Sequence, residues 1–199
     1  MKSKVLLWMA GAAAALALAA GIHALAQDST PTSFGGVLND YTPVSPSSTT
    51  AWEVRGPWSL RLNPENGTAN FSAALTMEFS INGQNPANVL ALNPHTHHIT
   101  MKGATITYNP TDCPLPASVT PIPRIEVSGM ATVAANGGPF PPGSSSPVSS
   151  HLQVCLDGGT SFGTVVTYSN ITLAFQAPAS GHFGLQPIHG VVRKANYED

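Results

Sequence analysis

Charged residues are scarce in this chain of 199 amino acids. Asp, Glu, Lys and Arg make up 9% of the sequence, where an average protein has about a quarter. Eight basic residues stand against ten acidic ones, and the basic residues form no run. Nucleic acids and anionic membrane surfaces recruit proteins through clustered Lys and Arg, so neither is an expected partner.

Cysteine is almost as scarce, with Cys113 and Cys155 as the only two. In an oxidising compartment an even pair most simply forms one disulfide. The alternative, two thiolate metal ligands, needs a reducing setting or a bound ion. A disulfide would close a loop of about 40 residues, worth roughly 3–4 kcal/mol in the chain-entropy model.

Long apolar stretches are missing except at the start of the chain. Lys2 and Lys4 precede an apolar run over residues 5–20, and Ala24-Leu25-Ala26 is a small-x-small cleavage site. The run is too short for a membrane span and is soon followed by that site. Residues 1–26 are therefore predicted to be a signal peptide. The expected location is secreted or periplasmic, with no stable membrane anchor.

Helical periodicity is nearly absent from the rest of the chain, where one short helical turn over residues 87–92 is the only expected helix. Residues 27–51 are rich in Pro, Ser and Thr and predict a flexible lead-in, of which residues 34–38 could dock on the domain. A single β domain is expected over residues 52–199.

Strand patterns fill that domain. Apolar side chains alternate with mostly polar ones from Phe71 to Phe79, and Asn66-Gly67 just before them is a strong hairpin turn. Gly56-Pro57 is expected to break the first strand region in two, and residues 165–175 are expected to form one long strand. About eight strands with short Gly, Pro and Asn turns predict an all-β fold, an antiparallel β-sandwich or barrel.

Two common hydrolase patterns are not supported by their surroundings. The segment Gly159-Thr160-Ser161-Phe162-Gly163 matches Gly-x-Ser-x-Gly, but a β-branched strand follows it instead of the helix that a nucleophile elbow requires. The glutamates are scattered and give no paired-carboxylate pattern for a glycosidase.

The densest chemistry lies in the segment Pro94-His95-Thr96-His97-His98. On a strand, His95 and His97 share a face, roughly 6.5 Å apart, whereas His98 points to the other side. The first two imidazoles can therefore converge on one ion. The competing interpretation is that they are hydrogen-bonded structural residues.

A third ligand must come from elsewhere, and His182 or His189 or both are expected to supply it. His151 is left out because it shares a strand face with Cys155, opposite the apolar side chains. Imidazole suits Zn or Cu, and the lack of nearby carboxylates argues against Ca or Mg.

Two functions remain open from the sequence. The first is an exported β-protein that binds Zn or Cu through His95, His97, His182 and His189, with a metalloenzyme as one form of it. The alternative is a non-catalytic binding or envelope-associated structural module without a metal. A small molecule or a glycan is the expected kind of partner.

Overall fold

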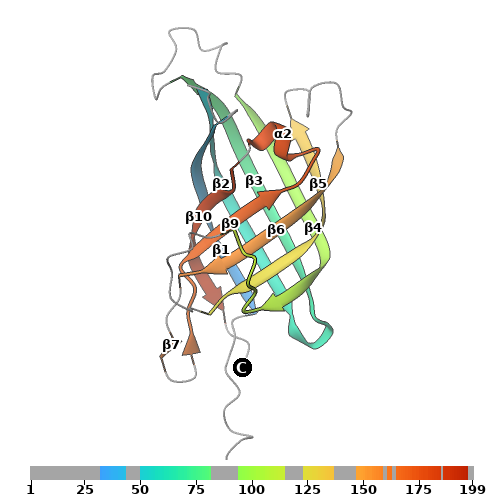
Figure 1. Cartoon of the computed structure of the whole chain (residues 1–199), viewed down its shortest axis with the longest axis vertical. Helices are drawn as coiled ribbons and strands as arrows, with labels where there is room; N and C mark the ends of the chain where they lie inside the picture. Colours follow the sequence, from blue (N-terminus) through green and yellow to red (C-terminus); the bar gives the residue numbers. More distant parts are fainter. Residues whose placement is uncertain are drawn as a thin grey trace, which may run out of the picture.

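A computed structural model describes residues 32–43, 50–81, 94–114, 123–136, 147–158, 161–162, 165–184 and 186–196. Eight strands form one closed barrel in the order β1-β10-β9-β6-β5-β4-β3-β2. Figure 1 shows the strands wrapped into this barrel. They are β1 (Ser33–Pro43), β2 (Thr50–Asn63), β3 (Thr68–Ile81), β4 (His95–Tyr108), β5 (Ile125–Asn136), β6 (Val148–Asp157), β9 (Asn170–Phe175) and β10 (Ile188–Asn196). The described chain also forms a small sheet of β7 (Ser161–Phe162) and β8 (Val165–Val166), the 3-10 turn η1 (Pro64–Asn66) and the helix α2 (Ser180–Phe183).

All neighbouring barrel strands are antiparallel. The all-β prediction is confirmed, and of its two forms the chain adopts the barrel. Closure depends on β1, which pairs with β2 on one side and with β10 on the other. A closed barrel has no free sheet edge, and free edges are where sheets pair with other chains.

Alternation along β3 explains which side chains fill the interior. Phe71, Leu75 and Met77 are at most 2% exposed, whereas Ser72 faces outward. The neighbouring strands repeat this pattern, so the apolar core lies inside the barrel. This is the outcome that a strict two-residue period predicts for a sheet with one buried face.

The predicted lead-in over residues 27–51 is wrong for residues 33–43, because they form β1 and the barrel begins before Trp52. Composition suggested flexibility, but the side chains of Phe34 and Leu38 are 4% and 1% exposed inside the barrel. Burial of two large apolar groups offsets the cost of ordering the strand.

The expected break at Gly56-Pro57 is also wrong, since β2 runs through it as one strand. The pairs Arg55↔Thr76 and Trp58↔Ala73 on either side share one register. Gly56 and Pro57 therefore interrupt the pairing with β3 locally without ending the strand. Conversely, the single strand expected over residues 165–175 is divided into β8 and β9. Tyr168 lies between them and packs its buried ring edge-on against Phe34 at 5.5 Å.

The described helix is not the predicted one. Residues 87–92, where a helical turn was expected, lie outside the described residues, as does the predicted signal peptide over residues 1–26. Instead α2 forms in a segment expected to be a loop. Among the helices that the structure describes, none has the length and apolar character needed to cross a bilayer.

The predicted disulfide is confirmed. Cys113, just beyond β4, is bonded to Cys155 on β6, and the two lie 42 positions apart in the sequence. Neither cysteine is free. A structural disulfide is typical of proteins that fold in an oxidising compartment.

Replacing Leu75 with Ala should lower the free energy of unfolding by about 2–4 kcal/mol, because the side chain is 1% exposed and its loss leaves a cavity. Urea unfolding followed by tryptophan fluorescence measures the change. Thr76→Val, on the outward side of the same strand, is the control and should change stability by less than about 0.5 kcal/mol. Equal effects in the two variants would contradict the assignment of faces on β3.

Candidate metal centre

The two faces of β4 differ as predicted. His95 and His97 are 6% and 0% exposed and face the barrel interior, whereas His98 is exposed on the outer side with Thr100. Register places His95 opposite Met77 and His97 opposite Leu75, two buried residues of β3. The strand therefore directs two imidazoles into the mostly apolar interior of the barrel.

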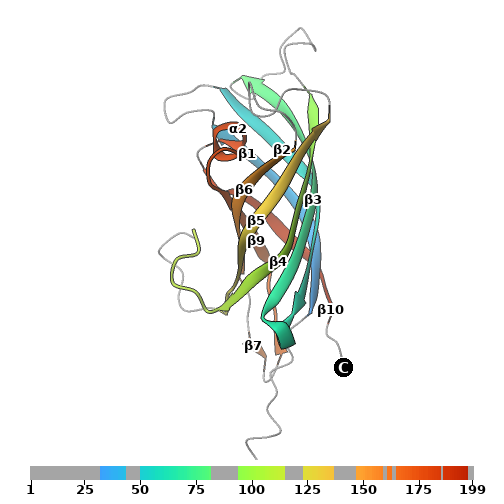
Figure 2. The same ribbon diagram turned by 90° about the vertical axis from the view of Figure 1, so that its right-hand side faces the viewer.

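The third imidazole comes from α2, which follows β9 and precedes β10 in the sequence. The helix lies near one end of the barrel (Figure 1 and Figure 2). The helix is one turn long, and the N–H groups of His182 and Phe183 both donate to the carbonyl of Ala179. Phe183 is 1% exposed and stacks on Phe175 at 4.6 Å, with 12° between the ring planes. This packing holds the helix against the barrel and fixes the position of His182.

The chain leaves α2 through Gly184, which has a φ of 96°. A Cβ at this position would lie 2.9 Å from the carbonyl oxygen of Pro43 and 2.9 Å from the Cβ of Thr42. Only glycine permits both this backbone conformation and this close approach to the end of β1. The C-terminal end of β1 thus packs against the chain just after the helix.

The three imidazoles converge through the same ring nitrogen. Nε2 of His182 lies 3.0 Å from Nε2 of His95 and 2.9 Å from Nε2 of His97. One nitrogen from each histidine lies within 4.8 Å of the other two. The barrel therefore contains a buried group of three histidines that could hold a metal ion.

Aromatic rings enclose this group. The ring of Trp52 lies 5.2 Å from that of His95 and 5.6 Å from that of His182. On the other side Phe183 lies 5.0 Å from His97. These contacts restrict rotation of the imidazoles and keep the surroundings of the three Nε2 atoms apolar.

Burial keeps at least two of the imidazoles neutral. The pKa of His97 is lowered from 6.5 to about 3, first by burial and then by repulsion from His182 and His95, while the backbone of Ala134 acts in the opposite direction. The pKa of His182 is lowered to about 4 by burial and then by His95. A histidine must be neutral to bind a metal ion, and both residues meet this condition at physiological pH.

The contacts cannot all be good hydrogen bonds. A neutral imidazole carries either one hydrogen or one lone pair at Nε2, so His182 can satisfy one of its two close neighbours through that atom. A cation placed between the three Nε2 lone pairs interacts favourably with all of them. In a tetrahedral site with Zn–N bonds of about 2.0–2.1 Å, ligand nitrogens lie about 3.3–3.4 Å apart. The two Nε2 atoms of His95 and His97 would need to move only about 0.4 Å farther from that of His182 to reach that spacing.

The structure does not bring His189 to this group. Its side chain is 53% exposed, and its Nδ1 lies 2.7 Å from Oδ2 of Asp40. The same carboxylate oxygen accepts a hydrogen bond from the backbone N–H of His189 at 2.8 Å. This histidine is thus held at the start of β10 by Asp40, away from the other predicted ligands.

A second group of metal-binding residue types consists of Cys113, Glu126 and Cys155. Its two sulfurs form the disulfide and so offer no thiolates. The amide of Gln153 donates to Glu126 at 3.1 Å. The disulfide and this hydrogen bond therefore stabilise the outer face of β5 and β6.

Sequence reasoning found the three converging histidines but missed the rings around them. Alternation on β2 places Trp52 and Val54 on one face, yet nothing in the sequence gives the height of Trp52 relative to β4. That height follows from register, in which Trp52 pairs with Phe79 and His95 pairs with Met77 two residues away.

Comparison of the chain with protein-family models, with curated proteins and with solved structures found no match in any of the three. The geometry of the three imidazoles is therefore what indicates a function for this chain.

The lowered pKa values predict how stability depends on pH. The folded state holds His97 and His182 neutral, so the unfolded state takes up protons first as the pH falls below about 6.5. Stability should be present above that pH and be lost as the pH falls towards 4. The expected loss is about 2 kcal/mol per histidine between pH 7.5 and pH 5.

Urea unfolding of the metal-free protein in a chelator, at pH 7.5 and at pH 5, measures this loss. His97→Leu should show a clearly smaller difference between the two pH values, whereas His98→Leu should behave like the parent. A parent protein with equal stability at both pH values would contradict the assignment of neutral, buried imidazoles.

Proposed function

We propose that this barrel binds a transition-metal ion, Zn(II) or Cu(II), through the Nε2 atoms of His95, His97 and His182. The observation that carries the proposal is the convergence of these three atoms inside an apolar, aromatic-lined end of the barrel. A purely structural role would not require three buried imidazoles to direct the same ring atom at one point.

The ligand set favours these metals. Imidazole nitrogen is a borderline ligand that suits Zn and Cu, whereas Ca and Mg prefer several carboxylate or carbonyl oxygens. Among the described residues, the converging group contains histidines and no carboxylate. The disulfide removes the thiolates that would favour softer ions.

Three protein ligands leave a tetrahedral ion one open position, which is the arrangement of catalytic zinc sites. A metal-bound water at such a position can act as a nucleophile near neutral pH. The reaction class that the site supports best is therefore metal-assisted hydrolysis or hydration of a small substrate. The protein's own part in that chemistry is to fix three ligands and to exclude bulk water with Trp52 and Phe183.

Titration of the metal-free protein with Zn(II) and Cu(II), followed by calorimetry at neutral pH, tests the ligand set. The parent should bind one ion with a dissociation constant below about 10 μM. His97→Ala and His182→Ala should abolish tight binding, since each removes one of three ligands. His98→Ala and His189→Ala should leave binding largely intact, because both side chains lie outside the converging group.

Circular dichroism and thermal unfolding of each variant establish that loss of binding is not loss of the fold. A bound ion should also raise the unfolding temperature of the parent, because it binds the folded state alone. Weak binding in the parent, or equal losses in His97→Ala and His98→Ala, would favour the alternative of a module without a metal. Hydrolysis of 4-nitrophenyl acetate that needs both the ion and His182 would distinguish a metalloenzyme from a non-catalytic metal-binding protein.

A further inference from the structure

A groove of about 730 Å³ lies on the outer surface formed by β10, β1, β2, β3 and β4. Its lining includes Ser33 at the start of β1. Gly184, the residue just after α2, lies beside Pro43 at the other end of that strand. The groove and the histidine group therefore occupy opposite ends of the barrel and opposite sides of its wall.

Small polar residues form the floor of the groove. Gly35 on β1 lies between Ser59 on β2 and Lys194 on β10, and Ser59 lies opposite Ser72 on β3. The hydroxyls of Ser59 and Ser72 are 2.8 Å apart and hydrogen-bonded. Because Gly35 has no side chain, the floor stays low between Lys194 and Ser59, and the hydroxyl of Ser59 stays accessible from that side.

Three cations stand around this floor. Arg61, Lys102 and Lys194 are exposed and come from β2, β4 and β10. Of the described residues that line the groove, none is Asp or Glu. The three are far apart in the sequence, which is why the chain shows no basic run although the fold collects a basic surface.

A bulge in β4 helps to place one of these cations. The register with β5 shifts between Met101 and Thr105, and Gly103 has a φ of 63°. The backbone N–H of Gly103 donates to the side-chain oxygen of Asn70 across the strand. Lys102 and Gly103 both face outward as a result, and Lys102 is directed to the groove.

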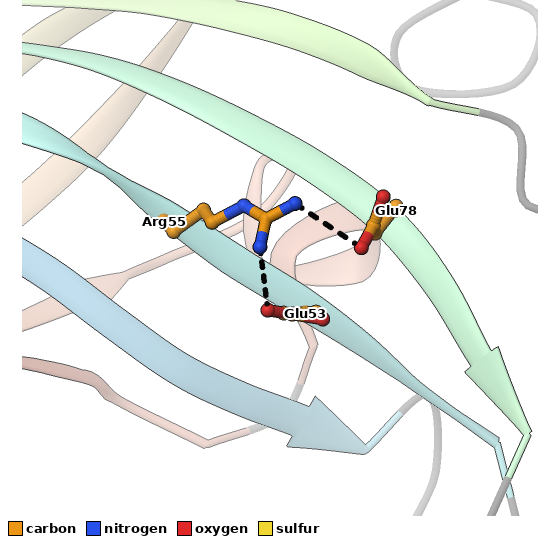
Figure 3. Close-up of polar contacts among 3 residues, drawn as sticks. All are labelled: Glu53, Arg55 and Glu78. Carbon is orange, nitrogen blue, oxygen red and sulfur yellow. Dashed lines mark hydrogen bonds and ion pairs between the residues drawn. The ribbon is translucent and has the colours of Figure 1, made fainter. Parts of the chain in front are cut away.

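The same outer wall shows a contrasting arrangement nearer the other end. Arg55 on β2 lies 3.1 Å from Glu53 and 3.2 Å from Glu78 on β3. Figure 3 shows the arginine reaching both glutamates. Glu53 and Glu78 are cross-strand neighbours, and the arginine between them offsets their repulsion. This cation is balanced within the protein, whereas Lys102 and Lys194 line a groove that has no carboxylate among its described lining residues.

We propose that this groove binds an anionic carbohydrate chain. Sulfate or carboxylate groups of such a chain match the three cations, and its hydroxyls match the serine and asparagine side chains of the floor. The groove crosses five strands, hence four spacings of roughly 4.8 Å each, which suits an extended oligomer better than a single small anion.

Two other anionic polymers fit less well. Single-stranded nucleic acid is held by exposed aromatic rings on which bases stack, but the aromatic residues lining the groove, Phe34 and Phe71, are 4% and 2% exposed. Membrane surfaces require clusters of about four to eight cations, commonly beside exposed apolar side chains. The exposed large apolar residues of the described chain, Tyr41, Tyr108, Met130 and Val191, do not line the groove.

Binding of a heparin-derived sulfated hexasaccharide and of a hexagalacturonate, measured by calorimetry at low salt, tests the proposal. The double variant Lys102→Gln/Lys194→Gln should weaken binding of the better ligand about tenfold or more. The control Arg55→Gln/Arg193→Gln removes the same charge from outside the groove and should weaken it less than about threefold. A neutral cellohexaose should not bind measurably.

Equal losses in the two double variants would overturn the proposal, because they would show attraction by net charge alone. Tighter binding to single-stranded DNA or to vesicles with phosphatidylserine than to either anionic oligosaccharide would also overturn it. Failure of both oligosaccharides to bind would overturn it as well. His182→Ala should bind the oligosaccharides like the parent, which separates this site from the metal site.

Discussion

The pairing of β1 with β10 is the constraint on which the rest of the structure depends. It closes the sheet and so defines an inside and an outside for every strand. The inside receives the apolar core and two histidines of β4, while the outside receives the polar and charged side chains. Closure also brings the last third of the chain beside the first, which places α2 over the histidines and Lys194 beside Gly35.

Local pattern predicted what lies within one strand, and it failed where distant segments meet. The two faces of β4 followed from alternation, so His95, His97 and His98 were assigned to the correct sides. That His182 joins them and His189 does not depends on how the chain runs from β9 to β10, where His182 lies 85 positions after His97 and 87 after His95. No local period carries that information.

Composition misled at β1 for a related reason. Pro, Ser and Thr around the strand resemble a linker, and the apolar residues at 34 and 38 are too few to signal a strand alone. Their burial becomes favourable only because β2 and β10 are both there to pair with the strand. The basic groove was invisible for the same reason, since Arg61, Lys102 and Lys194 meet only after closure.

The bulge at Gly103 divides β4 into two lengths with independent phase. Before the bulge, odd-numbered residues such as His97 and Met101 face inward. After the bulge, even-numbered residues such as Ala104 face inward. Deleting Gly103 would leave the histidines and Met101 facing inward and would keep Ala104 inward as well, because strict alternation after Met101 places Lys102 outside and Ala104 inside. The extra residue is therefore what allows inward positions of different parity on the two sides of the bulge. Loss of Gly103 would join the two inward faces into one alternating series and would remove the outward N–H that donates to Asn70 beside Lys102.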